Sequence, residues 1–168
     1  IKLPEWAPDY GRPEIHPTFG VIGVGARDFL VAYNIDLDTE DEKPAKNIAK
    51  AIRQSSGGFQ YVQAGPVYLE NRKHTQVTMN ILNFKKNPIY RVLETVKMEA
   101  ARYGVKVTGS EIVGLVPKDA LEKSLKYYYA SNNLTFPETM TISEIVTDVK
   151  KFMLFRDFDE TKIIEYFL

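Results

Sequence analysis

The stretch Phe29-Leu30-Val31-Ala32-Tyr33-Asn34-Ile35-Asp36-Leu37 decides the fold. Every second residue from Phe29 to Leu37 is apolar, which is the spacing of a β-strand with one buried face. The opposite face becomes polar towards Asn34 and Asp36. Such a pattern is typical of an antiparallel sheet that packs on one side only. We therefore predict a strand over 29–37 whose two faces lie in different environments.

Helical patterns follow this strand at intervals. Apolar residues recur every three or four positions over 40–54, and Asp41 is the preferred N-cap because Pro44 then removes no hydrogen bond. The clearest helix covers 88–103, and another is predicted from Pro117 to about residue 130. A capping box, Thr-Ile-Ser-Glu at 141–144, predicts a further helix, and Asp159 is expected to cap a last short one.

Three more strands are predicted between these helices. They cover 60–70, 75–85 and 105–110, and the first two form a hairpin around the turn 71–74. Pro66 places the strand over 60–70 at a sheet edge, because proline cannot donate to a neighbouring strand. The order strand, helix, strand, strand, helix, strand predicts an α+β, ferredoxin-like split βαβ sandwich. Its sheet is antiparallel with both helices on one face, and extra helices follow at the C-terminal end.

The sheet face opposite the helices is the most informative surface. It is expected to be rich in uncharged amides and hydroxyls and poor in lysine. Amides both donate and accept hydrogen bonds, so this pattern favours recognition of a ligand or of an adjoining domain. A merely solvated face is the alternative. The expected residues are Asn34, Asp36, Gln76, Thr78, Asn80, Thr108 and Ser110.

Composition excludes several classes of protein. The 168 residues carry 22 basic and 22 acidic side chains, so the basic excess that is common in nucleic-acid binders is absent. There is no cysteine and there are only two histidines, which argues against a zinc site. We find no segment apolar enough to span a membrane and no signal peptide. The predictions are therefore no metal, no nucleic acid and no membrane.

The chain is expected to have three parts. Residues 1–28 are rich in proline and glycine and also carry aromatic side chains, so we predict a linker docked against a surface. Residues 29–118 form the ferredoxin-like unit, and residues 119–168 form the helical extension. Because the first residue is Ile1, the sequence is expected to be a fragment or a processed product.

A few isolated residues invite a chemical interpretation. Arg27 follows a glycine-rich run that precedes a strand, so the run does not fit a dinucleotide loop, although Arg27 could pair with a carboxylate. His16 and His74 could act as bases at neutral pH, but neither has an acidic or nucleophilic neighbour in sequence. Glu111 stands in an apolar run, where it could be buried and functional or could point to water.

Several strings together resemble the formiminotransferase family of folate-dependent glutamate formimidoyltransferases. They span nearly the whole chain in the expected order, and they match the carboxyl-terminal subdomain of the family's transferase unit. These strings are Glu5-Trp6-Ala7-Pro8-Asp9-Tyr10-Gly11, His16-Pro17-Thr18, Gly25-Ala26-Arg27, Phe29 to Asn34, Gln76-Val77-Thr78-Met79-Asn80, Gly109 to Pro117, Asp157-Phe158-Asp159 and Ile164-Glu165-Tyr166.

The resemblance implies a cytoplasmic enzyme of histidine degradation. Two ferredoxin-like subdomains hold tetrahydrofolate, the co-substrate, in the groove between them, and a formimino or formyl group passes between it and N-formiminoglutamate. The family's catalytic histidine belongs to the missing N-terminal subdomain, as does a folate-binding stretch just upstream of Ile1. This chain alone is therefore expected to be inactive and to contain no catalytic residue. His16 matches a family string but not that histidine.

The folate or substrate contacts that we expect on this half are Gln76, Thr78, Asn80, Asn34, Arg27 and Glu111. The missing subdomain is the expected partner. Copies of the chain are also expected to form a homo-oligomer, most simply a dimer, through the uncovered face bordered by Leu30 and Leu82. A non-catalytic, small-molecule-sensing module of the same fold is the alternative function.

Overall fold

A four-stranded antiparallel sheet organises the computed structural model, which describes residues 3–168. The strands are β1 (Val31–Leu37), β2 (Val62–Leu69), β3 (His74–Ile81) and β4 (Val107–Val113). They lie in the order β2-β3-β1-β4, so β1 and β3 are central. Pro66 lies in β2, at the sheet edge, as its missing N–H predicts. The predicted ferredoxin-like order and antiparallel pairing are confirmed.

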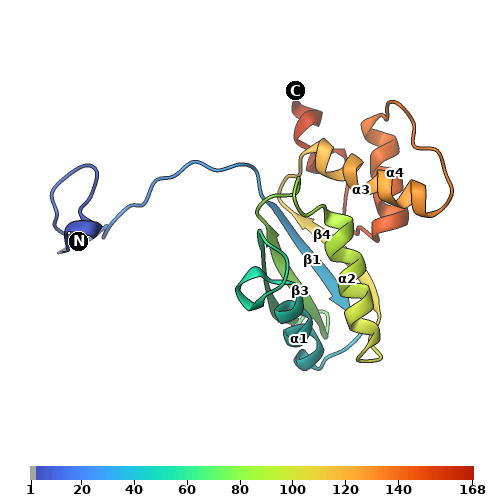
Figure 1. Ribbon diagram of the computed structural model, residues 1–168, viewed down its shortest axis with the longest axis horizontal. Helices are drawn as coiled ribbons and strands as arrows, with labels where there is room; N and C mark the ends of the chain where they lie inside the picture. Colours follow the sequence, from blue (N-terminus) through green and yellow to red (C-terminus); the bar gives the residue numbers. More distant parts are fainter. Residues whose placement is uncertain (1–2) are drawn as a thin grey trace.

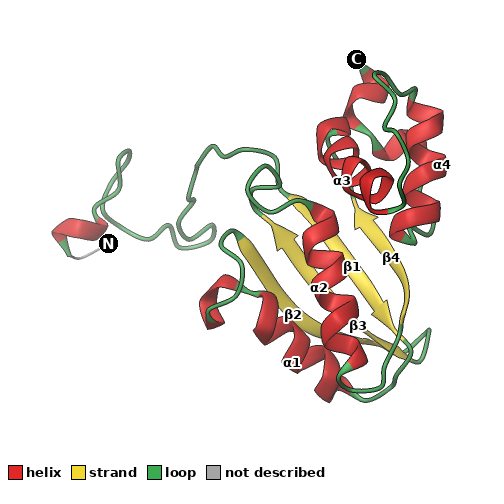
Figure 2. Ribbon diagram, turned by 45° about the vertical axis from the view of Figure 1, so that its right-hand side comes forward, coloured by secondary structure: helices red, strands yellow, loops and turns green. Residues whose placement is uncertain are grey.

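Helices α1 (Glu42–Ile52) and α2 (Ile89–Ala101) cover one face of the sheet (Figures 1 and 2). Asp41 is the N-cap of α1, and its side chain accepts a hydrogen bond from the N–H of Lys43 at 2.9 Å. The alternating apolar residues of β1, from Val31 to Leu37, are fully buried beneath these helices. Burying such side chains stabilises the fold by about 1.5–3 kcal/mol each.

The C-terminal part continues the same core. Helices α3 (Lys118–Ser131) and α4 (Ile142–Met153) pack beyond one end of the sheet, and their apolar faces belong to one cluster with the sheet residues (Figure 1). The predicted capping box opens α4, and Asp159 caps a short 3-10 helix, η3 (Glu160–Lys162). The remaining 3-10 helices are η1 (Pro4–Trp6), η2 (Gln54–Ser56) and η4 (Ile164–Phe167).

A bulge in β4 corrects one prediction from the sequence. Leu37 pairs with Val107 but Asp36 pairs with Gly109, so Thr108 is an extra residue in the ladder. Because side chains alternate along a strand, the bulge reverses the faces of the residues after it. Ser110 is therefore fully buried, and its Oγ donates to the Met153 carbonyl at 2.7 Å, whereas we expected it on the polar face.

The segment after α4 forms a short parallel β-bridge with β4, between Phe155 and Ser110. The Ser110 N–H donates to the Leu154 carbonyl at 2.9 Å, and the Arg156 N–H donates to the Ser110 carbonyl at 2.9 Å. This parallel bridge directs Phe155 into the core, where its ring lies 5.8 Å from that of Tyr33. The next residue, Arg156, consequently lies over the opposite face of the sheet.

The N-terminal segment lies apart from this body. Residues 3–28 extend away from the sheet (Figure 1), and their aromatic side chains are exposed: Trp6 is 67% exposed and Phe19 is 80% exposed. Residues 3–28 are therefore not packed on the sheet or its helices, and docking of residues 1–28 on another surface stays a prediction; residues 1–2 lie outside the described part. His16 stabilises a local turn, because its Nδ1 accepts from the N–H groups of Thr18 and Phe19.

Candidate functional site

The sheet face opposite α1 and α2 carries a network of polar side chains, and we call this surface the open face. Within residues 3–168 no helix covers it, and its central residues come from the three adjacent strands β3, β1 and β4 (Figure 2). The pairing registers place these residues in neighbouring rows. They are Ala32, Asn34, Asp36, Gln76, Thr78, Asn80, Gly109, Glu111 and Val113.

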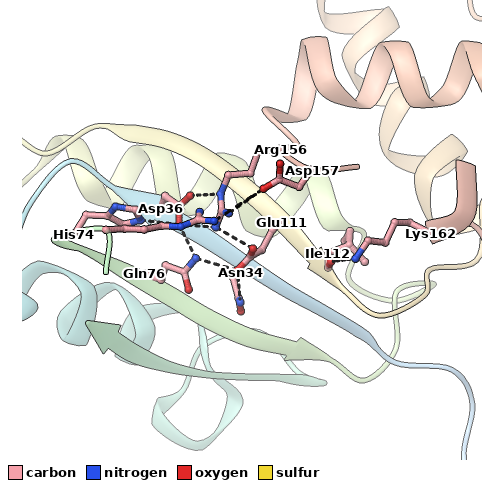
Figure 3. Close-up of polar contacts among 10 residues, drawn as sticks. Asn34, Asp36, His74, Gln76, Glu111, Ile112, Arg156, Asp157 and Lys162 are labelled. Atoms are coloured by element: carbon pink, nitrogen blue, oxygen red, sulfur yellow. Dashed lines mark hydrogen bonds and ion pairs between the residues drawn. The ribbon is translucent and has the colours of Figure 1, made fainter. Parts of the chain in front are cut away.

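Asp36 anchors the network from the middle of β1. Asp36 is only 3% exposed, yet its carboxylate has several polar partners. Arg156 Nε donates to Oδ2 at 2.6 Å, and Gln76 Nε2 donates to Oδ1 at 2.6 Å (Figure 3). His74 Nε2 lies 3.2 Å from Oδ1. A buried charge is tolerated only when it is paired in this way.

Glu111 is the second carboxylate of the network, and it is more accessible. Its Oε1 accepts from Asn34 Nδ2 at 2.9 Å and from Gln76 Nε2 at 3.0 Å, while Oε2 lies 2.9 Å from Arg156 Nη2. Its side chain remains 27% exposed. Arg156 therefore joins the two carboxylates, and Figure 3 shows the guanidinium between them.

Gly109 makes room for this guanidinium. A Cβ atom at this position would lie 3.2 Å from Asp36 Oδ2 and 3.7 Å from Arg156 Cδ. A larger residue would therefore push Arg156 away from Asp36. The contact between the Arg156 guanidinium and Asp36 therefore depends on glycine at position 109.

The network keeps both carboxyl groups ionised. Burial acts to raise the pKa of Asp36, but the hydrogen bonds from Arg156 and Gln76 outweigh it, so the pKa lies below its usual value. Burial also acts to raise the pKa of Glu111, but hydrogen bonds from Asn34 and Gln76 and the charge of Arg156 lower it overall. At neutral pH both groups accept hydrogen bonds and neither donates.

The structure brings together five of the six predicted site residues. Gln76 and Asn34 both donate a hydrogen bond to Glu111 Oε1. Thr78 and Asn80 continue along β3 on the same face, and within residues 3–168 their side chains make no hydrogen bond.

Arg27 is not part of this arrangement. It lies in the exposed N-terminal segment, where its Nη1 donates to the neighbouring Asp28 carbonyl at 3.3 Å.

Sequence reasoning missed two members of the network. Arg156 lies 45 positions beyond Glu111 in an irregular segment, so no periodic pattern connects them. His74 was set aside because no acidic residue adjoins it in sequence, but folding places it beside Asp36. The alternation of β1 already placed Asp36 on this face. A buried acid there requires a cation, and that requirement is the only signal that the sequence offers for Arg156.

Within residues 3–168 no three histidine, aspartate or glutamate side chains form a group that could hold a metal ion. None of the helices in that range is long and apolar enough to cross a membrane.

Comparison with known proteins adds independent information. Residues 32–168 match the formiminotransferase domain family. A glutamate formimidoyltransferase of Streptococcus pyogenes serotype M1 is 54% identical over 124 residues, which are 74% of this chain and 42% of the relative. A second, from Thermoplasma acidophilum, is 46% identical over 132 residues, or 79% of this chain and 43% of the relative.

A formimidoyltransferase-cyclodeaminase of Gallus gallus is 38% identical over 140 residues, which are 80% of this chain and 26% of the relative. The chain thus spans less than half the length of each of these curated relatives.

Proposed function

Because the chain belongs to the formiminotransferase domain family, as its sequence motifs indicated, we propose that it is the carboxyl-terminal subdomain of a folate-dependent transferase. The complete enzyme would move a formimino group, or a formyl group, between N-formiminoglutamate and tetrahydrofolate, in the cytoplasm and in histidine degradation. One observation carries this proposal: an uncovered sheet face that combines fixed amides with hydroxyl and amide groups that have no partner in residues 3–168.

The open face suits one wall of a groove. Within residues 3–168 the side chains of Thr78 and Asn80 make no hydrogen bond, so their donors and acceptors could match the polar edge of a pterin ring. A second wall, the N-terminal subdomain of the complete enzyme, would close the groove and hold both substrates in attack geometry. Such positioning contributes several kcal/mol to catalysis, with an upper range of about 7–11 kcal/mol for well-aligned reactants.

Proton transfer is assigned to the other subdomain. The two carboxyl groups of the open face have lowered pKa values and are ionised at neutral pH, so neither is suited to act as a general acid. His74 is half-enclosed against Asp36, and His16 belongs to a local turn. The role of this half is therefore binding and orientation.

Reconstitution tests the proposal. The chain is purified alone and together with the part of the Streptococcus pyogenes relative that it does not cover, about the first half of a transferase unit. Turnover of N-formiminoglutamate and tetrahydrofolate is expected only in the mixture. Binding of tetrahydrofolate is measured in parallel by calorimetry.

Two results would overturn the proposal. Turnover by the chain alone would show that the catalytic groups lie within it. A mixture that associates but neither binds tetrahydrofolate nor turns over would remove the transferase function, and binding of an unrelated small molecule would then favour a sensing module.

A further inference from the structure

The two amides beside Glu111 have a fixed orientation. Gln76 Nε2 donates to Asp36 Oδ1 at 2.6 Å and to Glu111 Oε1 at 3.0 Å, and Asn34 Nδ2 donates to the same Oε1 at 2.9 Å. A carboxylate can only accept hydrogen bonds, so a flipped amide would set oxygen against oxygen. The NH2 groups therefore point into the network, and the amide oxygens are left for another donor.

The side-chain amide atoms that lack a partner are acceptors, although Gln76 as a residue is only 2% exposed. Within residues 3–168 neither Gln76 Oε1 nor Asn34 Oδ1 accepts a hydrogen bond. Glu111 accepts two hydrogen bonds and forms one ion pair with Arg156, and a carboxylate offers about four acceptor sites. The Glu111 side chain is 27% exposed, whereas that of Asp36 is 4% exposed, so Glu111 is the carboxylate that a ligand can reach.

The donors of the network are already directed at carboxylates. Arg156 Nε and Nη2 face Asp36 and Glu111, and its Nη1 lies 3.6 Å from Asp157 Oδ2. His74 Nε2 lies 3.2 Å from Asp36 Oδ1; within residues 3–168 this atom and Arg156 Nη1 are buried and make no hydrogen bond, so neither is open to a ligand. Asp36, Glu111 and Arg156 sum to one negative charge, whereas the exposed Asp157 lies 4.0 Å from Arg72 Nη2 and adds no further net charge. The site therefore favours a cation with several N–H groups and disfavours an anion.

We infer that Glu111, with the side-chain oxygens of Gln76 and Asn34, forms a subsite for a planar amidinium group. This inference rests on the proposed function, because a formimino group is an amidine and a protonated amidine is a planar cation with N–H groups on both nitrogens. Paired N–H groups match a carboxylate oxygen and an adjacent amide oxygen in one plane. Arg156 and Gly109 are positioning residues: they hold Glu111 and the two amides without touching the ligand.

The subsite also provides selectivity. A formyl group has no second nitrogen and no positive charge, so it cannot donate to Glu111 and an amide oxygen together. Leaving a buried or half-buried acceptor without its donor is what makes such sites selective. The complete enzyme is therefore expected to prefer the formimino donor over the formyl donor.

Two small probes of the same shape test the inference on this chain. Formamidinium chloride and neutral formamide are titrated into the 15N-labelled chain at constant ionic strength, and the side-chain NH2 resonances of Asn34 and Gln76 are followed. Formamidinium should bind at least tenfold more tightly than formamide and should shift those resonances. Glu111→Gln should abolish this preference, whereas Glu138→Gln, an equal charge change in an exposed loop, should leave it intact.

The positioning role has its own readout. Arg156→Lys keeps the charge but loses the fork, so the Gln76 NH2 resonances should move before any ligand is added, and the preference should fall at least threefold. If that variant does not fold, Gly109→Ala makes the same test, because the added Cβ would lie 3.2 Å from Asp36 Oδ2.

Equal affinities for the two probes, shifts confined to other surfaces, or a preference that survives Glu111→Gln would overturn the inference. These outcomes are separable from the proposed function. Turnover in the reconstituted mixture without any formamidinium preference would contradict the subsite alone. A clear preference without turnover or folate binding would leave a cation subsite and contradict the transferase proposal.

Discussion

Replacing Arg156 with methionine tests how far the fold depends on the ion pairs of the open face. Methionine keeps most of the length of the side chain but removes the guanidinium. Asp36, whose side chain is 4% exposed, would then retain Gln76 as its hydrogen-bond donor and His74 as a neighbour. Glu111 would lose the 2.9 Å contact with Arg156 Nη2.

The expected loss in the free energy of unfolding is about 3 kcal/mol at pH 7. Removing one partner of a buried ion pair costs about 3–5 kcal/mol, and the lower end applies because the Arg156 side chain is 21% exposed. Protonation of Asp36 sets a ceiling. Protonating a carboxyl group of ordinary pKa at pH 7 costs about 4 kcal/mol, so the stranded carboxylate cannot disfavour the folded state relative to the unfolded chain by more than about that amount.

A second substitution separates stranded charge from lost packing. Adding Asp36→Asn to Arg156→Met removes the uncompensated carboxylate, so the double variant should regain about 1–2 kcal/mol relative to the single variant. Arg102→Met is the matched control. Arg102, at the C-cap of α2, is 66% exposed and lies 2.7 Å from Glu99, whose side chain is 13% exposed; a helical pair with one solvent-exposed partner contributes at most about 0.5 kcal/mol.

Urea denaturation followed by far-ultraviolet circular dichroism is the suitable assay. The single tryptophan, Trp6, lies in the exposed N-terminal segment, so its fluorescence does not report on the core. An Arg156→Met variant within 0.5 kcal/mol of the parent, like the Arg102→Met control, would show that the network does not hold Asp36 as we describe.

Three further predictions concern the same surface. Because Asp36 and Glu111 have lowered pKa values in the folded protein, the stabilisation that they give is complete above about pH 5 and is lost as the pH falls through the folded-state pKa values. The free energy of unfolding, measured from pH 7 to pH 2, should therefore drop steeply below about pH 4. The drop should be less steep in the Asp36→Asn variant. In the reconstituted enzyme, Asn80→Ala should weaken tetrahydrofolate binding by about 0.5–1.5 kcal/mol, and unchanged affinity by calorimetry would assign Asn80 to solvent. The chain alone should associate through the open face, where Val113 is 53% exposed. Light scattering should detect dimers, and the Val113→Lys variant should be monomeric. A parent chain that is a monomer at all concentrations would contradict this prediction.

The fold was predictable because its signals are local. Alternation in 29–37, the cap at Asp41 and the capping box at Thr141 each fix an element through neighbouring residues, and Pro66 identifies the edge strand. The order of these elements then leaves few topologies. Element ends differ from the predicted ones by a few residues at most; β4, for example, continues to Val113 beyond the predicted end at residue 110.

The site was less predictable because its decisive features are not local. The bulge at Thr108 exchanges the sheet faces on which Ser110 and Glu111 lie, and no residue type at that position predicts a bulge. Arg156 reaches the open face only because the chain after α4 forms a parallel β-bridge with β4. The aromatic residues of the N-terminal segment are exposed in this chain, so the surface on which they were predicted to dock stays a prediction.

Mapping the tetrahydrofolate contact tests the central claim, that the open face is a ligand-binding wall. The chain, labelled at its side-chain amides and methyl groups, is mixed with the complementary half of the Streptococcus pyogenes relative, and spectra are recorded before and after tetrahydrofolate is added. We predict shifts at Thr78, Asn80 and Val113 on the open face and none at Ile48 in α1 or Val96 in α2. Shifts confined to those helices, with the open-face signals unchanged, would contradict the claim.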